Sequence, residues 1–69
     1  MNRYYCESRL QARILEAVGP SQAAEAFALD FHAGASMVVV RVVEPDGKDQ
    51  FQFEVEVKRR AVARLVRER

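Results

Sequence analysis

The stretch that decides the fold is MVVVRVVEPDGKDQFQFEVEVK, residues 37–58. At its centre, Pro45-Asp46-Gly47 is typical of a tight turn, because proline presets φ and glycine tolerates a left-handed backbone. Residues 37–43 are rich in β-branched side chains, and residues 51–58 alternate strictly between apolar and polar ones. Two such segments around one turn predict an antiparallel β-hairpin whose second strand is buried on one face only.

The alternation predicts two unlike faces for this hairpin. The face that we expect in the core carries Val38, Val40, Val42, Phe51, Phe53, Val55 and Val57. The opposite face carries Gln52, Glu54, Glu56 and Lys58 from the second strand and Val39, Arg41 and Val43 from the first. An apolar patch rimmed by charge therefore remains on the polar side, which is typical of an interaction surface.

A helix is predicted between the Gly19-Pro20-Ser21 break and Gly34. Glycine ends the preceding element, proline cannot continue it, and Ser21 is a favourable N-cap. Gly34 stands where a helix commonly ends with a left-handed residue. One apolar stripe at helical spacing consists of Ala24, Phe27, Ala28 and Phe31. We expect this stripe to pack across one face of the sheet.

Residues 3–18 admit two interpretations. The segment RYYCES alternates loosely and favours a strand, whereas Leu10, Ile14 and Val18 recur as they would on a helix closed by Gly19. Helix propensity supports the second interpretation over residues 9–18. A two-stranded sheet is marginal alone, however, and strands here would extend it, so we favour strand pairing. The sequence leaves both possibilities open.

The chain ends in KRRAVARLVRER, residues 58–69. Val62, Leu65 and Val66 recur at i, i+3 and i+4, while arginines occupy another side, which predicts a short basic helix. Residues 1–57 carry five basic and nine acidic side chains, a net charge of −4, and residues 58–69 carry six and one, a net charge of +5. The acidic body therefore offers this helix a place to dock.

Together these elements predict a single α+β domain over residues 1–69: a small antiparallel sheet with one packed helix and a short C-terminal basic helix. A chain of this size buries only about 60% of the surface that it exposes when unfolded, so its core is marginal. Cys6 has no second cysteine for a disulfide, and Cys6 with His32 offers too few ligands for structural zinc. We therefore expect a homodimer or a complex to add stability.

The composition predicts a folded, cytoplasmic protein. Hydrophobic residues make up 49% of the chain and charged ones 30%, a balance that argues against disorder. No apolar run approaches the roughly 18 residues of a membrane span, and the first nine residues lack the apolar segment of a signal peptide. The single cysteine suits a reducing compartment, and no membrane partner is expected.

The residues that enzymatic chemistry requires are few. Cys6 and His32 are alone of their types and far apart, so we interpret Cys6 as a buried apolar residue and His32 as a helix-end residue. Glu54 and Glu56 share one strand face and are interpreted as solvated. Each glycine is explained by a cap or a turn, and no phosphate-binding loop is present. We predict no enzyme, no catalytic residue, no cofactor and no metal.

Protein binding is the leading functional prediction. The predicted partner-binding residues are Arg41, Val39, Val43, Arg60, Arg64 and Arg67. One alternative is that the C-terminal helix packs onto Val39 and Val43 and covers the patch. Another is a small nucleic-acid-binding or regulatory protein, whose C-terminal arginines lie along a phosphate backbone. The acidic body argues against nucleic acid, so we expect a protein partner.

The segment ARILEAVGPSQAAEAFA, residues 12–28, resembles one found in very short proteins of phages and their bacterial hosts. In those proteins a strand ending in Glu-Ala precedes a turn, a Ser- or Pro-led cap, a helix with paired alanines and then a hairpin. This order is similar to that of several anti-CRISPR proteins and other phage-encoded inhibitors. It implies an inhibitor that acts stoichiometrically in the host cytoplasm on a host complex, such as a CRISPR effector subunit. Many such proteins are acidic DNA mimics, and the basic end of this chain departs from that type.

Overall fold

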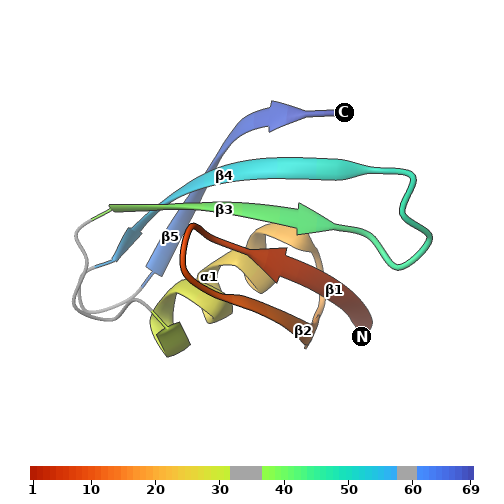
Figure 1. The fold of residues 1–69 in the computed structure, drawn as a ribbon, viewed down its shortest axis with the longest axis horizontal. Coiled ribbons are helices and arrows are strands. Elements are labelled where there is room, and N and C mark those ends of the chain that lie inside the picture. Colours follow the sequence, from red (N-terminus) through yellow and green to blue (C-terminus); the bar gives the residue numbers. More distant parts are fainter. Residues whose placement is uncertain (32–36, 58–60) are drawn as a thin grey trace.

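The structure is a computed structural model that describes residues 1–31, 37–57 and 61–69 (Figure 1). The elements in these ranges are β1 (Asn2–Glu7), β2 (Ala12–Ala17), α1 (Pro20–Phe31), β3 (Met37–Val43), β4 (Gln50–Val57) and β5 (Ala61–Glu68). The strands form one antiparallel sheet in the order β2-β1-β3-β4-β5, and α1 packs across one face of it. The predicted α+β class and the helix on one sheet face are confirmed.

The hairpin predicted from residues 37–58 is present as β3 and β4. Its turn has Gly47 at φ +75°, and the Gly47 N–H donates to the Glu44 carbonyl at 2.9 Å. The Asp46 carboxylate accepts from the Lys48 N–H at 2.9 Å, as expected of an aspartate in a turn. The buried residues of both strands are those that the alternation predicts, with Val40, Val42 and Val55 fully buried.

Residues 3–18 form strands, as favoured, and not a helix. β1 pairs with β2 on one side and with β3 on the other, so it links the two hairpins into one sheet. The alternative helical stripe would have needed burial, yet Leu10, Ile14 and Val18 are 80%, 57% and 71% exposed. Instead, Ala17 is buried and Leu15 packs against the core. Sheet completion therefore outweighs local helix propensity here.

Helix α1 begins two residues before the position that the Ser21 cap predicts. Pro20 is its first residue, and the first helical hydrogen bond runs from the Ala23 N–H to the Gly19 carbonyl at 3.0 Å. Gly19 is thus the N-cap and Pro20 occupies the first helical position, where a missing N–H costs nothing. The Ser21 hydroxyl instead donates to the Gln22 side chain. Gly34 and His32 lie outside the described residues.

The predicted C-terminal basic helix is wrong, because residues 61–68 form β5. β5 pairs with β4, placing Ala61 opposite Val57 and Ala63 opposite Val55 on the buried face. The supposed helical stripe is split: Val62 lies opposite Glu56 on the other face, and Leu65 lies opposite Phe53. Pairing along the free edge of β4 satisfies that edge's backbone groups, which a helix in this place would leave open.

The core lies between α1 and the sheet. Phe27 is its largest fully buried side chain and is surrounded by the buried alanines of the same helix, at positions 23, 24 and 28. These small residues allow the helix backbone to lie close to the strands. Tyr4 and Cys6 of β1 fill the core from the sheet side. With its helix on this side, the described chain leaves the opposite sheet face uncovered (Figure 1).

Candidate partner-binding site

The uncovered face of the sheet is organised in rows of residues that lie opposite one another across the strands. One row runs Glu7, Arg41, Gln52 and Arg67 through β1, β3, β4 and β5. The next row runs Tyr5, Val43 and Gln50 and ends at Arg69, whose backbone exchanges hydrogen bonds with that of Gln50 at 2.8 and 3.4 Å. Charged and amide groups from four strands therefore meet at one end of this face.

A hydrogen-bonded network fixes Arg41 in the first of these rows. Its Nε and Nη2 atoms donate to the same oxygen of Glu7, at 3.0 and 2.7 Å, and its Nη1 atom donates to Gln50 at 3.4 Å. The Tyr5 hydroxyl donates to the other Glu7 oxygen at 3.1 Å. Hydrogen bonds from Arg41 and then Tyr5 hold the pKa of Glu7 below its ordinary value. The bond to Glu7 raises the pKa of Tyr5.

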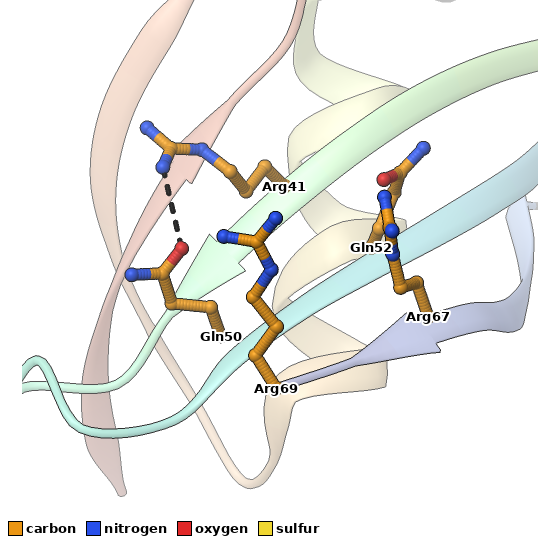
Figure 2. Close-up of a pocket in the computed structure, with 5 residues that line it drawn as sticks. All are labelled: Arg41, Gln50, Gln52, Arg67 and Arg69. Atoms are coloured by element: carbon orange, nitrogen blue, oxygen red, sulfur yellow. Dashed lines mark hydrogen bonds between the residues drawn. The ribbon is translucent and has the colours of Figure 1, made fainter.

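An arginine pocket of about 260 Å³ lies where the two rows meet. It is lined by Arg41, Gln50, Gln52, Arg67 and Arg69. Figure 2 shows these side chains on the side of the sheet away from α1, with Arg41 hydrogen-bonded to Gln50 and Arg69 extending from the strand end toward Arg41. Among the described residues, no carboxylate lies within ion-pair distance of Arg67 or Arg69. This end of the face therefore carries uncompensated positive charge.

A β-bulge places the two C-terminal arginines in this pocket. The register of β4 and β5 shifts between Gln52 and Phe53, so that Leu65 faces Phe53 but Arg67, not Val66, faces Gln52. Val66 is the extra residue, and the alternation of β5 reverses after it. Without the bulge, Arg67 would point to the helix side and Val66 to the open side. The pocket thus depends on one irregularity of the strand.

An apolar half adjoins the arginine pocket on the same face. Here Val39, Met37 and Val62 are each about half exposed, at 49%, 52% and 48%. Met37 and Val62 line a depression of about 360 Å³ together with Glu54, Glu56 and Arg64. Arg64 forms an ion pair with Glu54, directly across from it. Its charge is therefore neutralised within the face, unlike the charges of Arg67 and Arg69.

The structure brings together five of the six predicted partner-binding residues. Val39, Arg41 and Val43 of β3 and Arg64 and Arg67 of β5 share the open face, while Arg60 lies outside the described residues. The alternative in which a C-terminal helix covers Val39 and Val43 is wrong, because β5 lies beside β4 and leaves Val39 half exposed.

Several residues that line this face were not among the predicted partner-binding residues: Met37, Gln50, Gln52, Val62 and Arg69. The strand alternation of β3 and β4 was sufficient to place Met37 and Gln52. To place Arg69 on this face, one would have had to predict both the strand at residues 61–68 and the bulge within it. Neither has a signal in the sequence, because Ala61, Val62 and Ala63 are all apolar and no glycine or turn residue marks the bulge.

The remaining chemical candidates do not form a site. Cys6 is fully buried, and burial raises the pKa of its thiol to about 11, so it offers no thiolate to a substrate. Glu44 has its pKa raised by burial and by neighbouring acidic residues. Within residues 1–31, 37–57 and 61–69, no group of three His, Cys, Asp or Glu side chains is arranged to hold a metal ion.

Comparison with known proteins adds no relative. The chain matches no protein-family model, no curated protein and no solved structure. In the part of the chain that the structure describes, no helix is long and apolar enough to cross a membrane. The functional argument therefore rests on the open sheet face.

Proposed function

We propose that this protein is a non-enzymatic protein-binding module that uses the open face of its sheet. One observation carries the proposal: an uncovered sheet face places half-exposed Val39, Met37 and Val62 beside the arginine pocket. Apolar side chains interspersed with charged ones and bordered by arginines have the composition of a protein interface. A sheet offers this surface on a rigid scaffold, which lowers the entropy cost of binding.

The charge distribution supports a partner with an acidic surface. Arg41 and Arg64 are paired internally with Glu7 and Glu54, whereas Arg67 and Arg69 have no carboxylate side chain of the described residues within ion-pair distance and await a counterpart. The partner surface that fits is apolar opposite Val39 and acidic opposite the arginine pocket. Arginine suits this contact because its planar fork pairs with carboxylates through two hydrogen bonds.

The resemblance in element order to anti-CRISPR proteins supports a specific form of this proposal. In that form the partner is a subunit of a host complex, for example a CRISPR effector, and the protein inhibits by occupying its surface in the host cytoplasm. Inhibition by occupancy predicts saturation at one protein per binding site. Purified protein added to the assembled complex should therefore abolish its activity at a fixed molar ratio, without turnover.

Photo-crosslinking in the native cell tests the binding face. A photoreactive amino acid at position 39 should yield a discrete adduct with another protein, identified by mass spectrometry. The matched control at position 29 lies on α1, where Leu29 is 40% exposed. We expect no adduct there, and loss of the position-39 adduct on Arg67→Glu. Equal adducts at both positions would refute the proposal.

The same experiment separates the competing partners. An adduct of twice the monomer mass would identify a second copy of the chain, a result that light scattering on the purified protein would show as a dimer. An adduct with nucleic acid would instead support the small nucleic-acid-binding protein. Arg9→Glu provides the charge-matched control for Arg67→Glu, because Arg9 is exposed in the turn between β1 and β2.

A further inference from the structure

We propose that the arginine pocket is a binding site for a compact phosphate-type dianion, either inorganic phosphate or a phosphate monoester. Its lining contains three guanidinium groups, from Arg41, Arg67 and Arg69, and two carboxamides, from Gln50 and Gln52. No carboxylate lines it. Guanidinium groups match the oxygen geometry of phosphate through paired N–H donors, and an amide side chain can supply a further N–H.

The net charge of the cluster favours a dianion. Three arginines bring three positive charges, and Glu7, which holds Arg41 from the side, brings one negative charge. Among these side chains two positive charges remain, and no carboxylate side chain of the described residues lies within ion-pair distance of Arg67 or Arg69. A phosphate monoester carries close to two negative charges at neutral pH, so it neutralises the cluster, whereas a single carboxylate leaves half of the charge uncompensated.

The surroundings of the pocket favour a small anion over an extended polyanion. Beyond Gln52, the same face of β4 continues with Glu54 and Glu56. Arg64, the next arginine along β5, is already paired with Glu54. A nucleic-acid strand that left the pocket along the face would therefore meet carboxylates instead of cations. The volume of about 260 Å³ also suits a single small group.

The framework beneath the pocket fixes the side chain of Arg41 and the backbone of the other donors before a ligand arrives. Arg41 is fixed at three nitrogen atoms by Glu7 and Gln50. Arg67 lies directly opposite Gln52, and the Arg69 backbone is paired with that of Gln50. Donors mounted on paired strands lose less freedom on binding than donors on loops. The inference stands on this geometry and does not depend on a protein partner.

Nuclear magnetic resonance on the full chain tests the site directly. Inorganic phosphate is titrated at pH 7.5 and constant ionic strength, and the Nε–H signals of Arg41, Arg67 and Arg69 are followed. We expect saturable shifts confined to the pocket, with sulfate acting similarly and acetate binding at least about tenfold more weakly. Arg67→Gln and Arg69→Gln should each weaken phosphate binding by about tenfold. The matched control Arg64→Gln should leave it unchanged.

Four further measurements decide the outcome. Unchanged α1 and core signals in each variant show that the fold is intact, so that a lost shift reports the site. Glycerol phosphate should bind as inorganic phosphate does, which extends the site to monoesters. If no anion gives saturable shifts, or if Arg64→Gln weakens phosphate binding as much as Arg67→Gln does, the proposal is overturned.

Tighter binding of a single-stranded oligonucleotide than of phosphate, also lost in Arg64→Gln, would assign the face to nucleic acid instead. Val39→Asp should leave phosphate binding intact while it abolishes binding to a protein partner.

Discussion

The Glu25 carboxylate on α1 accepts a hydrogen bond from the backbone N–H of Ala63 in β5 at 2.9 Å. These residues are 38 positions apart, and their contact joins the helix to an edge strand of the sheet. An edge strand presents unpaired backbone groups on which another chain can pair. Glu25 therefore accepts from one of the backbone N–H groups that another chain would need in order to pair along this edge.

Glu25→Ala should weaken this edge. The loss of a hydrogen bond to a charged group predicts a decrease of about 1–2 kcal/mol in the free energy of unfolding, measured by urea denaturation. The Ala63 amide should exchange its hydrogen faster in the variant. Glu25→Gln keeps an acceptor oxygen and should lose less. If Glu25→Ala unfolds at the same urea concentration as the parent and the Ala63 amide stays equally protected, the edge does not depend on Glu25.

The contact with Glu25 also explains why the C-terminal segment was mispredicted. Val62, Leu65 and Val66 recur at helical spacing, and residues 61–68 show no regular alternation of apolar and polar side chains that would have favoured a strand. The choice depended on what lies beside it. β4 has a free edge, and Glu25 supplies an acceptor on the helix side, and neither fact is local to residues 61–68.

The open sheet face was predictable only where the strand pattern is regular. Strict alternation in β4, together with the predicted pairing of β3 with it, correctly placed Val39 and Arg41 opposite the core. Arg67 and Arg69 reach the face through the bulge at Val66, which no turn residue or glycine announces in the sequence. The pairing of Glu7 with Arg41 spans 34 residues and follows from the sheet order, which the sequence left open.

Two neighbouring valines of β3 should differ in how much unfolding free energy is lost when each is replaced by alanine. Val40 is fully buried, so Val40→Ala removes two buried methyl groups and should cost about 2 kcal/mol of unfolding free energy. Val39 is 49% exposed on the open face, and Val39→Ala should change stability by less than about 0.5 kcal/mol. Thermal unfolding followed by circular dichroism measures both. Equal losses would mean that the open face is covered in solution.

The Glu7–Arg41 pair should give the protein an acid-sensitive contribution to stability. Because the pKa of Glu7 is lower in the folded state, its contribution is fully present above the ordinary carboxyl pKa of 4.5 and is lost as pH falls through the folded value. The difference in unfolding free energy between the parent and Glu7→Gln should therefore be constant at neutral pH. It should shrink steadily below about pH 4.5.

Glu44 supplies the contrast for this measurement. Burial and neighbouring acidic residues raise its pKa, so the protonated form is favoured in the folded state. Its contribution to stability is present below its unfolded pKa and is lost as pH rises through the folded value. The parent should thus gain stability relative to Glu44→Gln on acidification, opposite in sign to the Glu7 series. Urea denaturation across pH 3–7 at fixed ionic strength compares the two variants, and the same slope in both would contradict the assignments.

Cys6 should report opening of the whole domain. Its thiol is fully buried, and the raised pKa of about 11 leaves almost no thiolate at pH 8, so alkylation requires unfolding. With a stability of about 3–5 kcal/mol for a domain of this size, modification of the native chain should be at least about a hundredfold slower than in urea. The exposed thiol of a Cys6→Ala, Gln11→Cys double variant should react at the free rate without denaturant. Rapid labelling of native Cys6 would show that β1 separates from the core well before the domain unfolds, and that the sheet face it helps to build is only transiently formed.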